Sequence, residues 1–185
     1  MALSPLVVTS LSQRAKRRSH EASMNQVNFT KILLTTDLSS EAAKAYPYAL
    51  SLSQRYNARL TILSCIDTSI GYSPSGVGSL EAPSLYVAET IDELRQGVRE
   101  DMRKHVAEYF RDISPHQEVR EAPYEVQHSI VSFIQENPCD LVIMASHGRS
   151  GISRALVGSV AEHVLRHSKT PVLVVPPMQS GSSGT

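Results

Sequence analysis

The sequence lacks an excess of charge of either sign. Lys and Arg number 18 and Asp and Glu number 18, so the formal net charge is zero at neutral pH. A basic surface is the usual electrostatic footprint of a protein that binds DNA or RNA. The balance of charges therefore argues against nucleic acid as the main partner.

Long apolar runs and cysteine-rich motifs are also missing. No stretch approaches the roughly 20 apolar residues that a membrane-spanning helix needs. The two cysteines, Cys65 and Cys139, lie far apart in the sequence, which fits neither a disulfide framework nor a thiol-rich metal site. With 41% hydrophobic and 19% charged residues over 185 positions, the composition predicts a single globular domain, soluble and cytoplasmic, with no membrane partner.

The two ends of the chain differ in composition from the part between them. Residues 1–27 hold a basic cluster at 14–18, and we expect them to form a flexible basic extension or to precede a natural start at Met24. A secretory signal is not indicated, because the apolar piece of this segment stands before the basic cluster rather than after it. Residues 178–185 are rich in Ser and Gly and predict a flexible tail, which leaves 28–177 as the folded domain.

Between these ends, short apolar runs alternate with segments of helical period. The apolar runs, which have the length of strands, are Lys31–Thr36, Leu60–Ile66, Val119–Val126, Asp140–Met144 and Pro171–Val175. The segments with an apolar residue every three or four positions predict helices at Ser39–Tyr56, 88–113, Ser129–Glu136 and Ser159–His167. Pro47 falls inside the first of these helices, where we expect it to produce a kink.

This alternation predicts an α/β protein. Strands that are apolar on both faces and separated by helices form a doubly wound parallel sheet, because right-handed crossovers place helices on both of its faces. Such sheets bind ligands at the carboxyl ends of their strands, so the chemistry is expected just after Thr36, Ile66 and Met144. The Ser-, Gly- and Pro-rich stretch 68–87 is longer than most strand-to-helix connections, and it predicts either a lid over this edge or a disordered loop.

One segment carries the residue types that bind anions. It reads M-A-S-H-G-R-S-G-I-S-R-A-L-V-G-S from Met144, follows an apolar run directly and opens a helix. Unpaired N–H groups and the positive end of the helix dipole favour an anion at such a place. Gly148 lets a phosphate approach the main chain, and Gly158-Ser159 provide successive amides and a hydroxyl.

Other interpretations of the same segment stay open. Ser159-Val-Ala-Glu162 fits a capping box, which needs no ligand. Glycines after a strand commonly serve as turn residues. Gly148-Arg-Ser-Gly151 fits the G-x-x-G of a KH loop, although that loop joins two helices and this segment leaves a strand.

The usual phosphate-binding signatures are absent from the sequence. There is no G-x-x-x-x-G-K-[ST] and no G-x-G-x-x-G after the first strand, which disfavours fast phosphoryl transfer. The G-x-S-x-G of serine hydrolases and the H-E-x-x-H of zinc proteases are absent too. His147 has no acid beside it in sequence, which favours a hydrogen-bonding role over that of a general base. We therefore assign no catalytic residue, and we expect Mg²⁺ only through the phosphates of a bound nucleotide.

These residues resemble the universal stress protein family. The resemblance depends on I-L-L-T-T-D-L-S-S-E from Ile32, on A-S-H-G followed by nine residues and G-S, and on V-A-E-H-V-L-R-H-S-K-T-P-V-L-V-V from Val160. It extends over about residues 28–177 and is loose between 68 and 127. It implies a five-stranded parallel sheet of order 3-2-1-4-5, commonly a dimer, and in one subfamily ATP held by G-x-x-G-x₉-G-[S/T].

The resemblance also implies a ligand site in which Asp37 contacts the adenosine part and Cys65 lies beside the adenine. The implied cofactor-binding residues are Thr35, Asp37, Cys65, Met144, Ala145, His147, Gly148, Arg149, Gly158, Ser159 and Val160. Two places depart from the family pattern: Ala145 stands for the first glycine of the motif, and Tyr124-Glu125-Val126 stands where a G-x-P is often found. Asp37 also fits an N-cap that holds no ligand.

The sequence thus predicts a stress-family protein that binds ATP as a regulatory ligand and hydrolyses it slowly, if at all. The alternatives are an ATP-independent dimeric interaction module and a slow hydrolase or nucleotidyl-transfer enzyme of the same fold. A homodimer is expected through the last strand, because prolines flank it as they flank edge strands and an exposed apolar edge needs a cover. Its interface residues are Val172, Leu173, Val174 and Val175.

Overall fold

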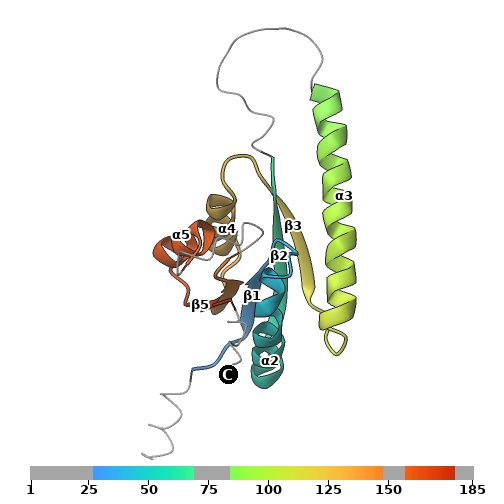
Figure 1. Cartoon of the computed structure of the whole chain (residues 1–185). Coiled ribbons are helices and arrows are strands. Elements are labelled where there is room, and N and C mark those ends of the chain that lie inside the picture. Colours follow the sequence, from blue (N-terminus) through green and yellow to red (C-terminus); the bar gives the residue numbers. More distant parts are fainter. Residues whose placement is uncertain (1–26, 69–83, 148–156, 178–185) are drawn as a thin grey trace, which may run out of the picture.

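Strands and helices alternate along the chain in the computed structural model, which describes residues 27–68, 84–147 and 157–177 (Figure 1). The elements are β1 (Lys31–Thr35), η1 (Ala42–Ala45), α2 (Tyr46–Tyr56), β2 (Arg59–Asp67), α3 (Ser84–Tyr109), β3 (His116–Ala122), α4 (Val126–Glu136), β4 (Leu141–Ala145), α5 (Ser159–His167) and β5 (Val172–Val175). The expected N-terminal extension up to residue 26, the tail and most of the stretch 68–87 lie outside the described residues.

The five strands form one parallel sheet in the order β3-β2-β1-β4-β5. β1 lies in the middle, with Leu33 opposite Thr61 of β2 on one side and opposite Val142 of β4 on the other. The strand order therefore reverses beside β1. The predicted fold class, the number of strands and their order are all confirmed.

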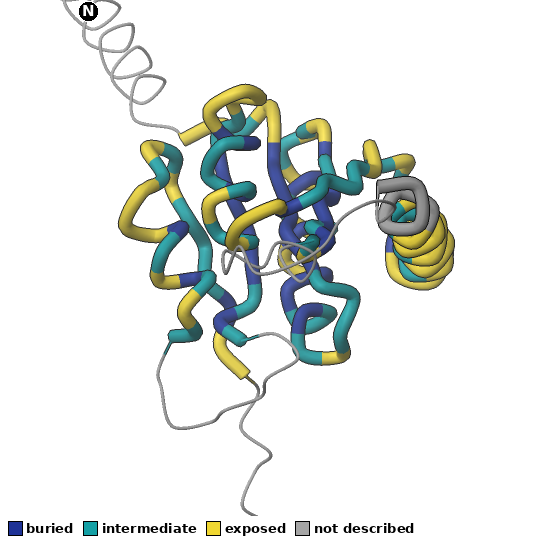
Figure 2. The backbone as a smooth tube through the Cα atoms, turned by 90° about the horizontal axis from the view of Figure 1, so that it is seen from above, coloured by how far each residue is buried: buried dark blue, intermediate teal, exposed yellow. Residues whose placement is uncertain are grey.

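The helices cover both faces of the sheet, with α2 and α3 on one side and α4 and α5 on the other (Figure 1). Because successive strand residues point to opposite faces, Ile32 and Leu34 enter the core beneath α2 and α3, whereas Leu33 enters the core beneath α4 and α5. Viewed from above, the buried residues lie mainly along the strands, between the two helix layers (Figure 2). The doubly wound arrangement follows directly from strands that are apolar on both faces.

The first predicted helix is divided in two. A 3₁₀ turn, η1, leads into α2, and Pro47 is the second residue of α2 rather than an interior one. Proline is tolerated there because the N–H groups of the first helical turn have no acceptor within the helix. The predicted kink was therefore wrong, and the chain changes from one helix type to the other instead.

β3 lies earlier in the chain than predicted. It pairs only with β2 at the edge of the sheet, and its first two residues, His116 and Gln117, are exposed. A polar edge strand carries little apolar signal, so the prediction placed the strand over Val119–Val126 instead. Val126 in fact opens α4, whereas the predicted limits of α5 are confirmed. No helix in the described ranges is long and apolar enough to cross a membrane.

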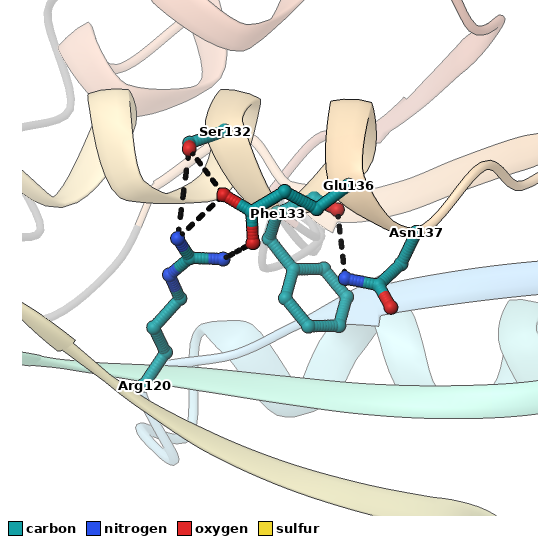
Figure 3. Close-up of polar contacts among 5 residues, drawn as sticks. All are labelled: Arg120, Ser132, Phe133, Glu136 and Asn137. Carbon is teal, nitrogen blue, oxygen red and sulfur yellow. Dashed lines mark hydrogen bonds and ion pairs between the residues drawn. The ribbon is translucent and has the colours of Figure 1, made fainter.

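Arg120 on β3 fixes the far end of α4 to the sheet (Figure 3). Its guanidinium donates to the two carboxylate oxygens of Glu136 at 2.8 and 2.9 Å and lies 5.9 Å from the ring centroid of Phe133. Ser132 Oγ donates to the same carboxylate at 2.8 Å. The hydrogen bonds from Arg120 and then Ser132 lower the pKa of Glu136 to about 2.

Candidate functional site

A pocket of about 380 Å³ opens at the carboxyl ends of β1, β2 and β4. Its remaining walls come from the start of η1 and from the first part of α4 and of α5. This is the edge at which the strand order reverses, which is where doubly wound sheets place their ligands. The pocket therefore lies where the sequence predicted the chemistry.

A larger hollow, of about 1190 Å³, lies at the opposite edge, near the amino ends of β1, β2 and β3. Two of the arginines that line it are paired with carboxylates of the same hollow, Arg120 with Glu136 and Arg95 with Glu121. These ion pairs join β3 to α4 and to α3. We interpret the larger hollow as a seam between elements, and the smaller pocket as the candidate site.

Every predicted ligand-binding residue that the structure describes lines the smaller pocket. These residues are Thr35, Asp37, Cys65, Met144, Ala145, His147, Gly158, Ser159 and Val160. The other two predicted residues, Gly148 and Arg149, lie outside the described residues. Folding thus brings three strand ends and the start of α5 into one cavity.

Sequence reasoning missed several residues of the pocket wall. They are Thr36, Ala42, Leu63, Val126, Ile130, Ser146 and Ala161. Thr36 and Ser146 directly follow β1 and β4, and a polar residue at a strand end is a signal that can be read from sequence. The apolar side chains of Val126 and Ile130 carry no such signal, because apolar residues on a helix look like ordinary core.

Gly158 packs closely against the end of β4. Its N–H donates to the carbonyl oxygen of Ser146 at 2.7 Å, and a Cβ added to Gly158 would lie 2.7 Å from the same oxygen. Position 158 therefore requires glycine because of this close approach. The Gly158 amide is engaged inside the protein, contrary to the expectation that it faces a ligand, so the anion-binding amides begin at Ser159.

The capping box, one of the alternative interpretations of this segment, does not form. The N-cap of α5 is Gly158, with φ −72° and ψ 159°, and no side chain hydrogen-bonds to this cap. Ser159 is instead the first helical residue and is exposed at the pocket. The N–H groups of the first turn have no acceptor within the helix, and those of Ser159 and Val160 belong to residues that line the pocket. The start of α5 thus has the geometry of an anion site.

Asp37 is held by a local network while it lines the pocket. Its Oδ1 accepts hydrogen bonds from the backbone N–H of Ser39 at 3.0 Å and from the Ser39 hydroxyl at 2.6 Å. Ser39 Oγ in turn accepts from the N–H of Ala42, at the start of η1. Ser39 rather than Asp37 thus contacts the helical turn, and Asp37 orients Ser39.

Ala145 replaces the motif glycine without strain. It ends β4, pairs with Val175, and is not among the residues of positive φ in the described part of the chain. An alanine methyl is obstructive only where the backbone needs a positive φ. The strand end therefore accommodates alanine at this position without backbone strain.

His147 has one ring nitrogen engaged and one without a partner. Nδ1 lies 3.0 Å from the Ser146 hydroxyl, and the buried Nε2 has no hydrogen-bond partner among the described residues. A buried polar atom without a partner costs free energy. Because His147 lines the pocket, a polar ligand atom is a suitable partner for Nε2.

Cys65 contributes an apolar wall rather than a reactive group. Burial raises the pKa of its thiol to about 11, and the charge of Arg120, its neighbour across the strand pair, offsets this only in part. The thiol stays protonated at neutral pH, a form that is neither a nucleophile nor a metal ligand. Within the described ranges, no group of three or more His, Cys, Asp or Glu residues is arranged to hold a metal ion.

Comparison with known protein families tests the family resemblance that the motifs indicated. The sequence model described as the universal stress protein family matches residues 28–176, which is most of the chain. The chain belongs to the universal stress protein family. This universal stress protein is 29% identical over 147 residues to universal stress protein MJ0531 of Methanocaldococcus jannaschii, covering 80% of this chain and 82% of that protein. It is also 29% identical over 150 residues to YxiE of Bacillus subtilis, covering 80% and 99% of the two chains.

Solved structures share the fold of this universal stress protein. UspA from Lactobacillus plantarum superposes with a TM-score of 0.64 at 24% identity, covering 81% of this chain and 99% of that one. The protein MJ0577 gives a TM-score of 0.65 at 25% identity, covering 83% and 100%. A universal stress protein in complex with cAMP gives 0.52 at 23% identity, covering 82% and 100%.

Proposed function

We propose that this universal stress protein acts in the cytoplasmic stress response by binding ATP as a regulatory ligand in the pocket at the carboxyl ends of β1, β2 and β4. The proposal depends mainly on the position of the start of α5. The first turn of this helix forms part of the pocket wall, beside the ends of three strands. Phosphate oxygens suit the N–H groups of Ser159 and Val160 and the positive end of the helix dipole.

The remaining walls suit an adenosine. β2 and β4 lie on opposite sides of β1, so Cys65 and α4 are on one side of the pocket and the start of α5 is on the other. Cys65, Val126 and Ile130 provide an apolar surface for the base. Asp37, at the end of the central strand, is placed to accept a hydrogen bond from ribose. The neighbour that holds cAMP binds a nucleotide with the same adenosine part.

The proposal includes slow turnover of ATP. Asp37 is the sole carboxylate among the described residues that line the pocket, and Ser39 occupies one of its oxygens. No described lysine or arginine lines the pocket either. A metal ion would enter with the nucleotide phosphates. ATP would then act by occupying the pocket rather than by being consumed, and the ATP-independent module remains the alternative function.

The proposal also includes a homodimer through β5. This strand pairs only with β4, and the carbonyl oxygens of Pro171 and Val175 accept hydrogen bonds from the N–H groups of Val142 in β4 and of Ser146, the residue after β4. Because bonding alternates along a parallel pair, the N–H and C=O groups of Val172 and Val174 point to the open edge. An unpaired apolar edge invites a second strand, and two-fold pairing of identical strands provides one.

A proline at position 159 tests the phosphate site. Ser159→Pro removes the first amide of α5, and the fold should accommodate it because proline suits the first helical position and Gly158 has the extended backbone that a residue before proline prefers. We expect ATP affinity in calorimetry to fall roughly tenfold, the loss of one charge-assisted hydrogen bond. Ser159→Ala, which removes only the hydroxyl, is the matched control and should lose less.

Calorimetry with ATP, ADP, cAMP and GTP, together with mass spectrometry of ligand released from denatured protein, decides between the candidate functions. Binding of adenine nucleotides in preference to GTP supports the proposal. A wild-type protein that binds none of them, or a Ser159→Pro variant with unchanged affinity, contradicts it and favours the interaction module. Turnover above about one per second would favour an enzyme.

A further inference from the structure

The loop that carries Asp37 into the pocket has an unusual backbone. Leu38, the next residue, adopts φ 61°, in the left-handed region that residues with a side chain rarely enter. Its side chain packs against the core beneath α2 and α3, while Asp37 lines the pocket at the end of β1. The left-handed turn thus sets the direction in which Asp37 is presented, and some interaction must stabilise it.

A buried chain of hydrogen bonds provides that stabilisation. The N–H of Leu38 donates to Thr36 Oγ1 at 2.9 Å, and Thr36 Oγ1 lies 2.7 Å from the hydroxyl of Tyr46. Thr36 is 7% exposed and Tyr46 only 2%. Water therefore has little access to replace the Tyr46 hydroxyl, and the position of the Thr36 hydroxyl depends on it.

Tyr46 is itself held firmly and does not reach the ligand. Its ring contacts those of Tyr109 and Phe110, with centroids 5.2 and 5.4 Å away, and its hydroxyl lies 3.3 Å from Nδ1 of His105 on α3. Burial raises its pKa to about 12, so the hydroxyl keeps its proton. Thr36 lines the pocket, whereas Tyr46 stands behind it in the core of the opposite face.

We propose that Tyr46 is a positioning residue for the pocket: its hydroxyl holds Thr36, and Thr36 holds the left-handed turn at Leu38 that presents Asp37 to the ribose of a bound nucleotide. The inference rests on the proposed function for its effect on binding. The hydrogen-bond chain itself can be tested without any ligand, so the two proposals can fail separately.

The first measurement concerns the turn alone. Tyr46→Phe keeps the ring contacts and removes the hydroxyl, so amide hydrogen exchange at Leu38 should become several times faster in the variant. Amides in α5, on the other face of the sheet, serve as the internal control and should not change. Equal exchange at Leu38 in the two proteins would overturn the inference, whatever the wild type binds.

The second measurement concerns binding. Calorimetry should show about fivefold weaker ATP binding by Tyr46→Phe, which corresponds to the net loss of one hydrogen bond. In a Thr36→Val background, Tyr46→Phe should have little further effect on ATP affinity, because the hydrogen bonds through the Thr36 hydroxyl are already lost. Full additivity of the two substitutions would contradict the inference, as would unchanged affinity in Tyr46→Phe alongside a wild type that binds.

A rescue experiment separates positioning from general damage. Glycine reaches the left-handed region without strain, so adding Leu38→Gly to Tyr46→Phe should restore most of the lost affinity. Leu38→Ala removes the same side-chain packing but keeps a Cβ, and it should restore nothing. Equal recovery with glycine and alanine at position 38 would show that the turn is not what Tyr46 controls.

Discussion

The amide of Gly158 and the carbonyl oxygen of Ser146 form a hydrogen bond of 2.7 Å that joins the start of α5 to the end of β4. Both residues line the candidate pocket, and the bond sets how far the first turn of α5 stands from the strand. The close approach exists because residue 158 has no side chain. The phosphate end of the proposed site is therefore built by packing as well as by helix geometry.

Gly158→Ala should destabilise the protein. The added Cβ would lie 2.7 Å from Ser146 O, closer than atoms tolerate, while the φ of −72° shows that backbone strain is not the cause. We expect a loss of about 1 to 3 kcal/mol in the free energy of unfolding, measured by chemical denaturation. Gly97→Ala is the matched control, because it has open space around it in α3 and should stabilise by roughly 0.5 to 1 kcal/mol. Equal effects at the two glycines would contradict the packing argument.

Glu136→Gln should change the acid stability of the protein. The pKa of Glu136 is lowered from 4.5 to about 2 by its bonds to Arg120 and Ser132, so its contribution is present above pH 4.5 and is lost as pH falls towards 2. Wild type and variant should therefore differ above pH 4.5 and converge below it in denaturation curves. Glu100→Gln, which affects an exposed ion pair with Arg103, should show little difference at any pH. A constant gap between wild type and Glu136→Gln at all pH values would refute the linkage.

A cluster of histidines joins α4 to α5 and should make stability depend on mildly acidic pH. The ring centroids of His128 and His163 are 4.5 Å apart, and those of His163 and His167 are 4.1 Å apart. Desolvation first, and then the charges of His167 and His128, lower the pKa of His163 below 6.5, and the opposing effect of Glu125 is smaller. The unfolded chain then binds more protons below pH 6.5, so the free energy of unfolding falls as pH drops from 6.5 to the folded pKa.

Replacing His163 tests whether this histidine lowers the stability of the protein as the pH drops. His163→Gln should show a smaller decrease in melting temperature than the wild type between about pH 7.5 and pH 5. The effect should be small, because this cluster is open to solvent. A His163→Gln curve parallel to that of the wild type would contradict the prediction.

The proposed dimer can be tested on the backbone of β5. Val174→Pro removes an N–H that points to the open edge, so it should give monomers in light scattering at micromolar concentration while the pairing with β4 is kept. Leu173→Pro removes an N–H directed to β4 and should instead lower the melting temperature. A wild type that is already monomeric, or a Val174→Pro variant that remains dimeric, would argue against this interface.

Much of the site could be predicted from the sequence, because its parts carry local signals. Gly158, Ser159 and Asp37 stand at junctions between a strand and a helix, and such junctions are visible as changes of apolar period. The strand order could then be obtained from the family resemblance, which placed the carboxyl ends of β1, β2 and β4 side by side. The limits of α5 were correct because its amphipathic pattern is strong and is bounded by Gly158.

Other features depend on contacts that no local pattern records. β3 was misplaced because its edge position allows polar residues, and Pro47 lies in the first turn of α2, after the 3₁₀ turn η1, rather than at a kink inside one helix. The apolar residues Val126 and Ile130 belong to the pocket only because α4 packs against β2 and α5. Arg120 and Glu136 meet only because β3 and α4 pack together.

What the sequence determined by itself is therefore the class of fold and the junctions that surround the ligand edge, since both follow from short-range periodicity and from residue types such as glycine. Only the tertiary structure decided that the Gly158 amide bonds to Ser146 and that Tyr46 stands behind Thr36. These relationships depend on the direction of single N–H and O–H groups. Such directions are set when elements pack against one another, because burial removes the water that would otherwise satisfy each group.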